Sequence, residues 1–222
     1  MENSGKYVIL TAYAGILAAV TDLVSTVGFG FLYPGYSWIN DTVSKLGATA
    51  SPVSGQISAL WIIIGILLIL FGLGFRKAFA GKGHYAILVS WLIVLYGLGE
   101  GIGSGVFKAD RLANALTTSG FIHEIFGSVG VIAILLFPLA MLKIIPETEN
   151  RKMYLLSKFA FSGGIIFILL FLSRYSADST NFISVYKGLW QRLFILISYI
   201  YLISIAALII YRQQNKSHYP EK

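Results

Sequence analysis

The sequence predicts an all-α integral membrane protein, a bundle of six transmembrane helices forming a single domain over residues 1–222. Hydrophobic residues make up 56% of the chain and charged residues only 12%, whereas a soluble domain is about a quarter charged. Six segments are apolar over roughly 20 residues, the length that crosses a bilayer. Apolar runs such as residues 60–70 lack the period-two alternation of barrel strands, so helices remain as the way to satisfy the backbone in lipid.

The predicted helices follow the apolar runs in chain order. The polar start of the chain is short and the first apolar run is too long for a signal peptide, so no removable leader is expected. The longest connection, residues 33–54, joins the first and second helices, and residues 39–46 within it form either a short interfacial helix or a plain connector. The six helices cover about residues 7–31, 55–75, 85–107, 120–142, 155–173 and 186–211.

Basic residues predict the orientation. Lysines and arginines are concentrated before the first helix, between the second and third, between the fourth and fifth, and after the sixth. The positive-inside rule therefore predicts cytoplasmic N and C termini in a multi-pass protein of the cell membrane, with the long loop outside. The net charge of +7 is explained by this topology, and no nucleic-acid partner is expected.

A few ionisable residues lie inside the apolar runs or at their mouths. Such groups are costly at membrane depth and are usually functional. With the predicted orientation they all fall in the outer half of the membrane, which chance scattering would not produce. They are Asp22, Glu100, His123, Glu124, Arg174 and Arg192.

Helical phase indicates that three of these groups face the interior of the bundle. Asp22, Glu100 and His123 each share a helix face with small residues, which mark close helix packing in membranes. The run 97–105 (GLGEGIGSG) holds two interleaved glycine series, which predicts a central third helix in contact with neighbours on two faces.

Several kinds of chemistry are excluded by composition. The chain has no cysteine, so it has no disulfide, thiolate nucleophile or iron–sulfur site. Of its histidines, His84 and His218 fall on the cytoplasmic side, so a three-histidine zinc site is excluded, and neither a metal nor a cofactor is expected. General acid–base catalysis by His123 with Glu100 or Asp22 remains open.

Two arginines point to a different role. Guanidinium groups bind phosphate or carboxylate in two-pronged fashion, and Arg174 and Arg192, with Gln191, are expected at the outer interface. The structural alternative is that Glu100 pairs with Arg192 or Arg174 and only stabilises the bundle.

The chain resembles the bacterial and archaeal membrane family catalogued as domain of unknown function number 998. The resemblance rests on residues 33–36 (YPGY), 44–47 (SKLG), 107–110 (FKAD) and 188–192 (GLWQR), with His123 between the last two. It implies about six membrane helices and no known activity, and it adds Asp110 to His123, Gln191 and Arg192 as site residues. Lys45 stands where the family pattern often has an acid.

These observations predict a polar pocket in the outer leaflet that binds a lipid or small amphiphile through its headgroup. Its expected ligand-binding residues are Arg192, Gln191, Arg174, Asp110, His123, Glu100 and Asp22. One alternative is a lipid-modifying enzyme that uses His123 as acid or base, with Glu100 and Asp22 as the other catalytic groups. The other is a non-catalytic accessory or structural subunit. The expected partner is membrane lipid, and the sequence leaves open an oligomer or a partner subunit.

Overall fold

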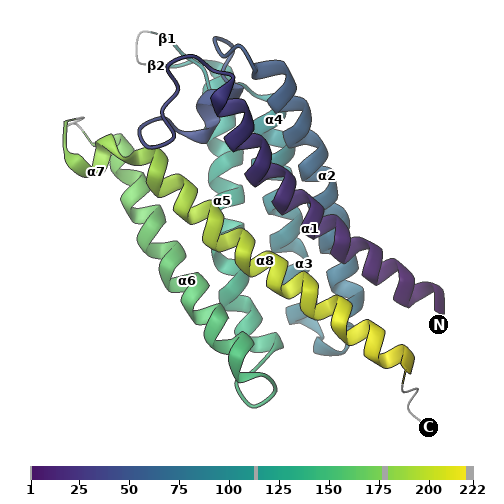
Figure 1. The fold of residues 1–222 in the computed structure, drawn as a ribbon. Coiled ribbons are helices and arrows are strands. Elements are labelled where there is room, and N and C mark those ends of the chain that lie inside the picture. Colours follow the sequence, from purple (N-terminus) through teal and green to yellow (C-terminus); the bar gives the residue numbers. More distant parts are fainter. Residues whose placement is uncertain (1, 113–114, 177–179, 219–222) are drawn as a thin grey trace.

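The computed structural model describes residues 2–112, 115–176 and 180–218. Within these residues, six helices are long and apolar enough to cross a membrane, which confirms the all-α six-helix bundle (Figure 1). The first helix starts earlier and the last ends later than the apolar runs suggest. The long helices are α1 (Glu2–Phe31), α2 (Ser54–Ala78), α3 (His84–Tyr96), α5 (Thr118–Ile144), α6 (Arg151–Leu172) and α8 (Lys187–His218).

The third span is not a regular α-helix throughout. It consists of α3, a π-helical segment (Gly97–Gly103) and the short α4 (Ser104–Val106). A π-helical insertion widens the helix locally and is frequently found at functional sites. The insertion has Glu100 at its centre.

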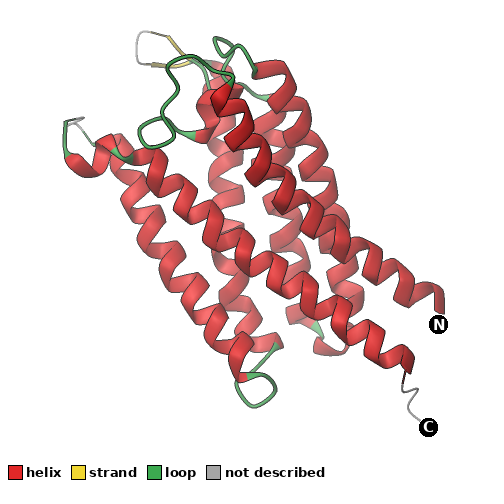
Figure 2. Ribbon diagram, in the orientation of Figure 1, coloured by secondary structure: helices red, strands yellow, loops and turns green. Residues whose placement is uncertain are grey.

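The six spans form a closed ring in chain order. Each span packs on the preceding and the following one, and α8 closes the ring on α1. The chain ends lie together at one end of the bundle, while the loop between α1 and α2 and a small hairpin lie at the other (Figure 2). We call these the termini end and the loop end. The described residues also form β1 (Arg111–Leu112), paired antiparallel with β2 (Ala115–Leu116), the short α7 (Phe182–Val185), and three 3₁₀ turns, Val43–Gly47, Ala80–Lys82 and Ser173–Tyr175.

The glycines of the third span bring it close to two neighbours, as the sequence predicts. A Cβ on Gly101 would lie 2.7 Å from the backbone nitrogen of Gly65 in α2. A Cβ on Gly99 would lie 2.7 Å from the backbone nitrogen of Gly130 in α5. The two glycine series therefore face different helices, and this span has the largest buried share of the six, 61%.

Large aromatic side chains fill the centre of the ring toward the termini end. Phe71 and Phe75 of α2 meet Phe137 of α5 and Tyr201 of α8, and all four side chains are fully buried. The Tyr201 hydroxyl also lies 2.7 Å from the hydroxyl of Ser157 in α6. These contacts join four of the six spans.

Ion pairs hold the polar turns at the termini end. The carboxylate of Glu149, in the turn before α6, accepts hydrogen bonds from Lys82 at 2.6 Å and from Arg212 of α8 at 2.9 Å. Partial burial opposes ionisation, but the two cations outweigh it and lower the pKa of the Glu149 carboxyl.

The long loop is held in place at the loop end by the start of α8. The Arg192 guanidinium donates to the carbonyl oxygens of Trp38 at 2.7 Å and Asp41 at 2.9 Å, and also to the Tyr36 hydroxyl. Burial raises the pKa of Tyr36, which keeps its phenol neutral beside the arginine. The helical part of the loop is a single 3₁₀ turn, Val43–Gly47, which begins later than the stretch expected from the sequence.

Candidate functional site

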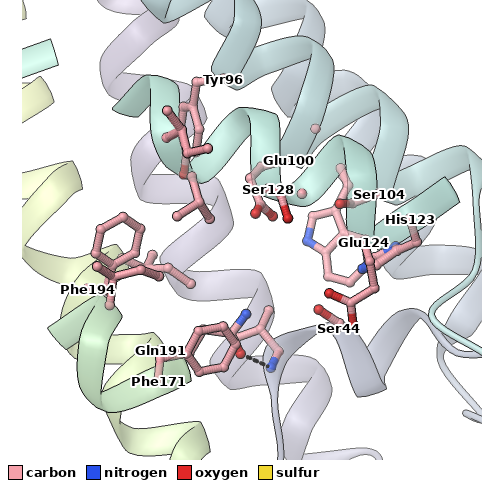
Figure 3. A pocket seen from close by; sticks show the side chains of 18 of the residues that line it. Ser44, Tyr96, Glu100, Ser104, His123, Glu124, Ser128, Phe171, Gln191 and Phe194 are labelled. Atoms are coloured by element: carbon pink, nitrogen blue, oxygen red, sulfur yellow. Dashed lines mark hydrogen bonds between the residues drawn. The ribbon is translucent and has the colours of Figure 1, made fainter. Parts of the chain in front are cut away.

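A cavity of about 270 Å³ occupies the centre of the ring in the half nearer the loop end. All six spans contribute to its wall, and the 3₁₀ turn adds Val43 and Ser44. In Figure 3, Glu100, Ser104 and Ser128 reach toward it from one side, and Phe171, Phe194 and Gln191 from the other. The cavity therefore brings together residues that are far apart in the sequence.

Glu100 enters the cavity from the π-helical segment. Two glycines of α5 make room for it, because a Cβ on Gly130 would lie 2.8 Å from the Glu100 Cγ and one on Gly127 would lie 3.4 Å from its Oε1. Among the described residues, no hydrogen bond or ion pair reaches the Glu100 carboxylate. The carboxylate thus faces the cavity without a hydrogen-bond partner in the described part of the chain.

Asp22 lies deeper in the same cavity and is 8% exposed. The hydroxyl of Tyr199, in α8, donates to its Oδ2 at 2.9 Å. The Trp61 indole is close enough to act on the same carboxyl, but Oδ1 receives no hydrogen bond of normal length and angle from any described residue. A buried oxygen of this kind calls for a ligand or a proton, because burying an isolated carboxylate is costly.

His123 is held in one tautomer. Its Nδ1 lies 2.9 Å from the carbonyl oxygen of Phe107, and a carbonyl can only accept, so Nδ1 carries the proton. In the neutral ring, Nε2 then offers a lone pair. His123 is 5% exposed and lines the cavity with Ser44 and Ser104.

Arg174, at the end of the α6 span, lies at the cavity wall in an ion pair. Its Nη2 is 2.6 Å from the Oε2 of Glu124, and the Tyr175 hydroxyl bonds to both partners. The guanidinium also lies 4.2 Å from the centre of the Phe171 ring. Its Nε has no partner among the described residues. The positive charge of Arg174 is therefore matched locally by Glu124.

The expected site residues divide into two groups. Asp22, Glu100, His123, Arg174 and Gln191 line the cavity, and Glu124 lines it with them. Gln191 accepts a hydrogen bond from the Val43 backbone at 2.8 Å through its Oε1, which leaves its NH₂ group for other contacts.

Arg192 and Asp110 lie outside the cavity. Arg192 donates to the loop carbonyls described above. It does not pair with Glu100, as the structural alternative would require of Arg192 or Arg174. Asp110 accepts from the backbone nitrogen of Thr49 at 2.8 Å and from its hydroxyl at 2.6 Å. Both residues therefore hold the long loop, Arg192 at Trp38 and Asp41, and Asp110 at Thr49.

Aromatic wall residues were missed by sequence reasoning. Tyr96 and Tyr199 pack at 6.1 Å between ring centres, and Trp61, Phe171, Tyr175 and Phe194 also line the cavity. The sequence does contain a signal for Tyr199. Tyrosines concentrate at membrane interfaces, so a tyrosine well inside the last apolar run is unusual and marks a candidate for the interior of the bundle. No set of three or more His, Cys, Asp or Glu side chains within the described residues is placed to hold a metal ion.

Comparison with known proteins gives a family and no activity. A family model described as "Protein of unknown function (DUF998)" matches residues 16–208, a stretch that includes every side chain of the cavity wall. No curated protein and no solved structure matches the chain. Because the match covers most of the sequence, this integral membrane protein belongs to the DUF998 family.

Proposed function

We propose that the protein binds a lipid or small amphiphile in the central cavity through the ligand's headgroup. The observation that carries this proposal is the mixed lining of the cavity. The cavity is lined by polar side chains, Asp22, Glu100, His123 and Gln191, and by apolar side chains of α5 and α6, among them Val131, Ile132, Ile168 and Leu172. A ligand with both a polar and an apolar part satisfies both kinds of surface.

The volume of the cavity limits how much of the ligand it can enclose. Pockets for drug-sized ligands have about 300–1,000 Å³, and 270 Å³ is just below that range. A headgroup or a small molecule fits, and the tail of a larger lipid has to leave between the helices. Of the six spans, the α6 span has the smallest buried share, 22%, and it forms part of the cavity wall. We therefore expect the tail to exit beside α6.

The proposal is tested by native mass spectrometry of the protein extracted in a mild non-ionic detergent. The wild type should retain a bound small molecule, and Glu100→Gln should lose it. Glu147→Gln is the matched control, because Glu147 is an exposed carboxylate in the turn before α6, remote from the cavity. An empty wild-type protein, or equal retention in both variants, would contradict the proposal.

A second candidate function is supported by the tautomer of His123. With Nδ1 bonded to Phe107, the Nε2 lone pair can accept a proton from a bound substrate, as a general base does. Incubation with a total lipid extract, followed by mass analysis of the extract, tests this. Turnover should disappear in His123→Ala and persist in His84→Ala. A lipid that stays bound and unchanged would favour binding without catalysis.

The orientation also remains a proposal. We infer from the distribution of basic residues that the termini end faces the cytoplasm and the cavity lies in the outer leaflet of the cell membrane. A reporter that works only in the cytoplasm should be active when fused after Lys222. Activity of an exported reporter at the same position would reverse the orientation and place the cavity in the inner leaflet.

A further inference from the structure

We propose that the ligand of the central cavity is an organic cation, an amphiphile whose headgroup carries a protonated or quaternary amine. This inference rests on the proposed binding function and names its ligand class. It departs from the expectation that arginines select an anionic headgroup.

The guanidinium groups of the two arginines are already engaged by protein partners. Arg174 is paired with Glu124 at 2.6 Å, and a tyrosine hydroxyl completes the pair. Arg192 is directed at backbone carbonyls of the long loop and does not line the cavity. Arg111 lies 3.5 Å from the other oxygen of Glu124, but it is exposed and also does not line the cavity. The Nε of Arg174 has no partner among the described residues, but an anionic headgroup bound there would have to share the guanidinium with Glu124.

The carboxylates, by contrast, are available. Within the described residues, Asp22 Oδ1 is buried without a hydrogen-bond partner, and Glu100 faces the cavity with no hydrogen bond. The two groups are near enough to interact electrostatically. Two carboxylates that share a poorly hydrated space repel each other, and a cation between them removes that repulsion. With both carboxylates ionised, the unmatched charge of the cavity wall is negative, because Arg174 is already paired with Glu124.

Aromatic rings supply a second, independent feature. Trp61, Tyr96, Phe194 and Tyr199 line the cavity together with the two carboxylates. Aromatic faces attract cations, and combinations of aromatic rings and carboxylates recognise quaternary ammonium groups in proteins. The wall already shows this preference, because the Arg174 guanidinium rests on the Phe171 and Tyr175 rings at 4.2 and 4.5 Å.

Three amphiphiles with the same decyl tail test the inference. They are decyltrimethylammonium, decyl phosphate and decyl glucoside, each added to the detergent-solubilised protein after removal of co-purified ligand, with binding read by native mass spectrometry. The cation should bind the wild type most tightly. Glu100→Gln should weaken it by about tenfold or more, the scale of one lost charge-assisted contact. Glu147→Gln should leave it unchanged.

The outcomes distinguish the proposed binding function from the proposed preference for a cation. If the phosphate or the glucoside binds and the cation does not, the binding function stands and the cation inference is wrong. If none of the three binds, both fail. Equal cation binding in the wild type and Glu100→Gln also overturns the inference. Asp22→Asn is a second variant, valid where its elution profile matches the wild type. Tetramethylammonium should compete with decyltrimethylammonium if the headgroup determines recognition, and its failure to compete would mean that the tail alone binds.

Discussion

The two halves of the bundle are built from the same six spans but use them differently. Toward the termini end, Phe71, Phe75, Phe137 and Tyr201 fill the centre of the ring. Toward the loop end, the same helices surround a cavity whose wall carries Asp22 and ion-pair partners. The ring of six helices is therefore compatible with both a packed centre and an open cavity. The size and polarity of the inward-facing side chains decide whether the centre is packed or open.

The first prediction concerns the close approach of the third span, on which both halves depend. Gly101→Leu should destabilise the protein by about 3 kcal/mol or more, because the added side chain meets the backbone of Gly65, which cannot rotate away. Unfolding in mixed micelles with increasing SDS measures this. Gly28→Leu is the control, since a Cβ there meets nothing within 4 Å. Similar effects in both variants would mean that the close approach is not required.

The second prediction compares an aromatic residue from each half. Phe75→Ala should cost about 3 kcal/mol, because it removes contacts with Phe71, Phe79 and Phe137 in a filled core. Phe194→Ala should cost less, because that ring, although buried, packs against the cavity on one side. The same SDS titration measures both. A larger loss for Phe194 would indicate that the cavity half is the more tightly packed one.

The third prediction concerns the anchor of the long loop. Arg192→Gln should destabilise the protein by about 2 kcal/mol, because it leaves the Trp38 and Asp41 carbonyls without their donor. Since Arg192 does not contact Glu100, the double variant with Glu100→Gln should be additive within about 0.5 kcal/mol. A coupling well beyond that would show that the two side chains meet in the membrane, and the cavity wall would then include Arg192.

The fold was largely predictable because its signals are local. Six apolar runs specify six helices, and the glycine spacing of residues 97–105 specifies a helix packed on two sides. The phase argument for Asp22, Glu100 and His123 is also local, and the structure places all three at the cavity. Each of these inferences needs only the neighbours within one helix.

The assignments that needed contacts across the ring were less accessible. Nothing near Asp22 indicates that Tyr199 donates to it, because the two are 177 residues apart. Arginine is a common ligand-binding residue, yet the partners of Arg192 are backbone carbonyls of the long loop. Because every residue has a backbone carbonyl, the sequence of the loop does not reveal these contacts. The π-helical segment places Glu100 against glycines of α5, a contact that the sequence of the third span alone does not reveal. These features follow from packing between spans.

The smallest predicted effect tests the electrostatics of the termini end. The folded protein lowers the pKa of Glu149 below its ordinary value of 4.5, so the carboxylate stabilises the fold fully above that value. The contribution should be lost as the pH falls through the lower, folded pKa. Its size should stay below about 1 kcal/mol, because the side chain is 31% exposed and its two ion pairs are accessible to water and salt. Glu149→Gln should therefore be less stable than the wild type at neutral pH and equal to it in strong acid.

The control is Glu147→Gln. The Glu147 side chain is 54% exposed beside Arg151, so this variant should match the wild type at every pH. The pair formed by Arg174 and Glu124, at the cavity wall, is less exposed, so adding salt should weaken the Glu149 contribution first. A Glu149 contribution that resisted salt would show that the turns at the termini end are as shielded as the cavity.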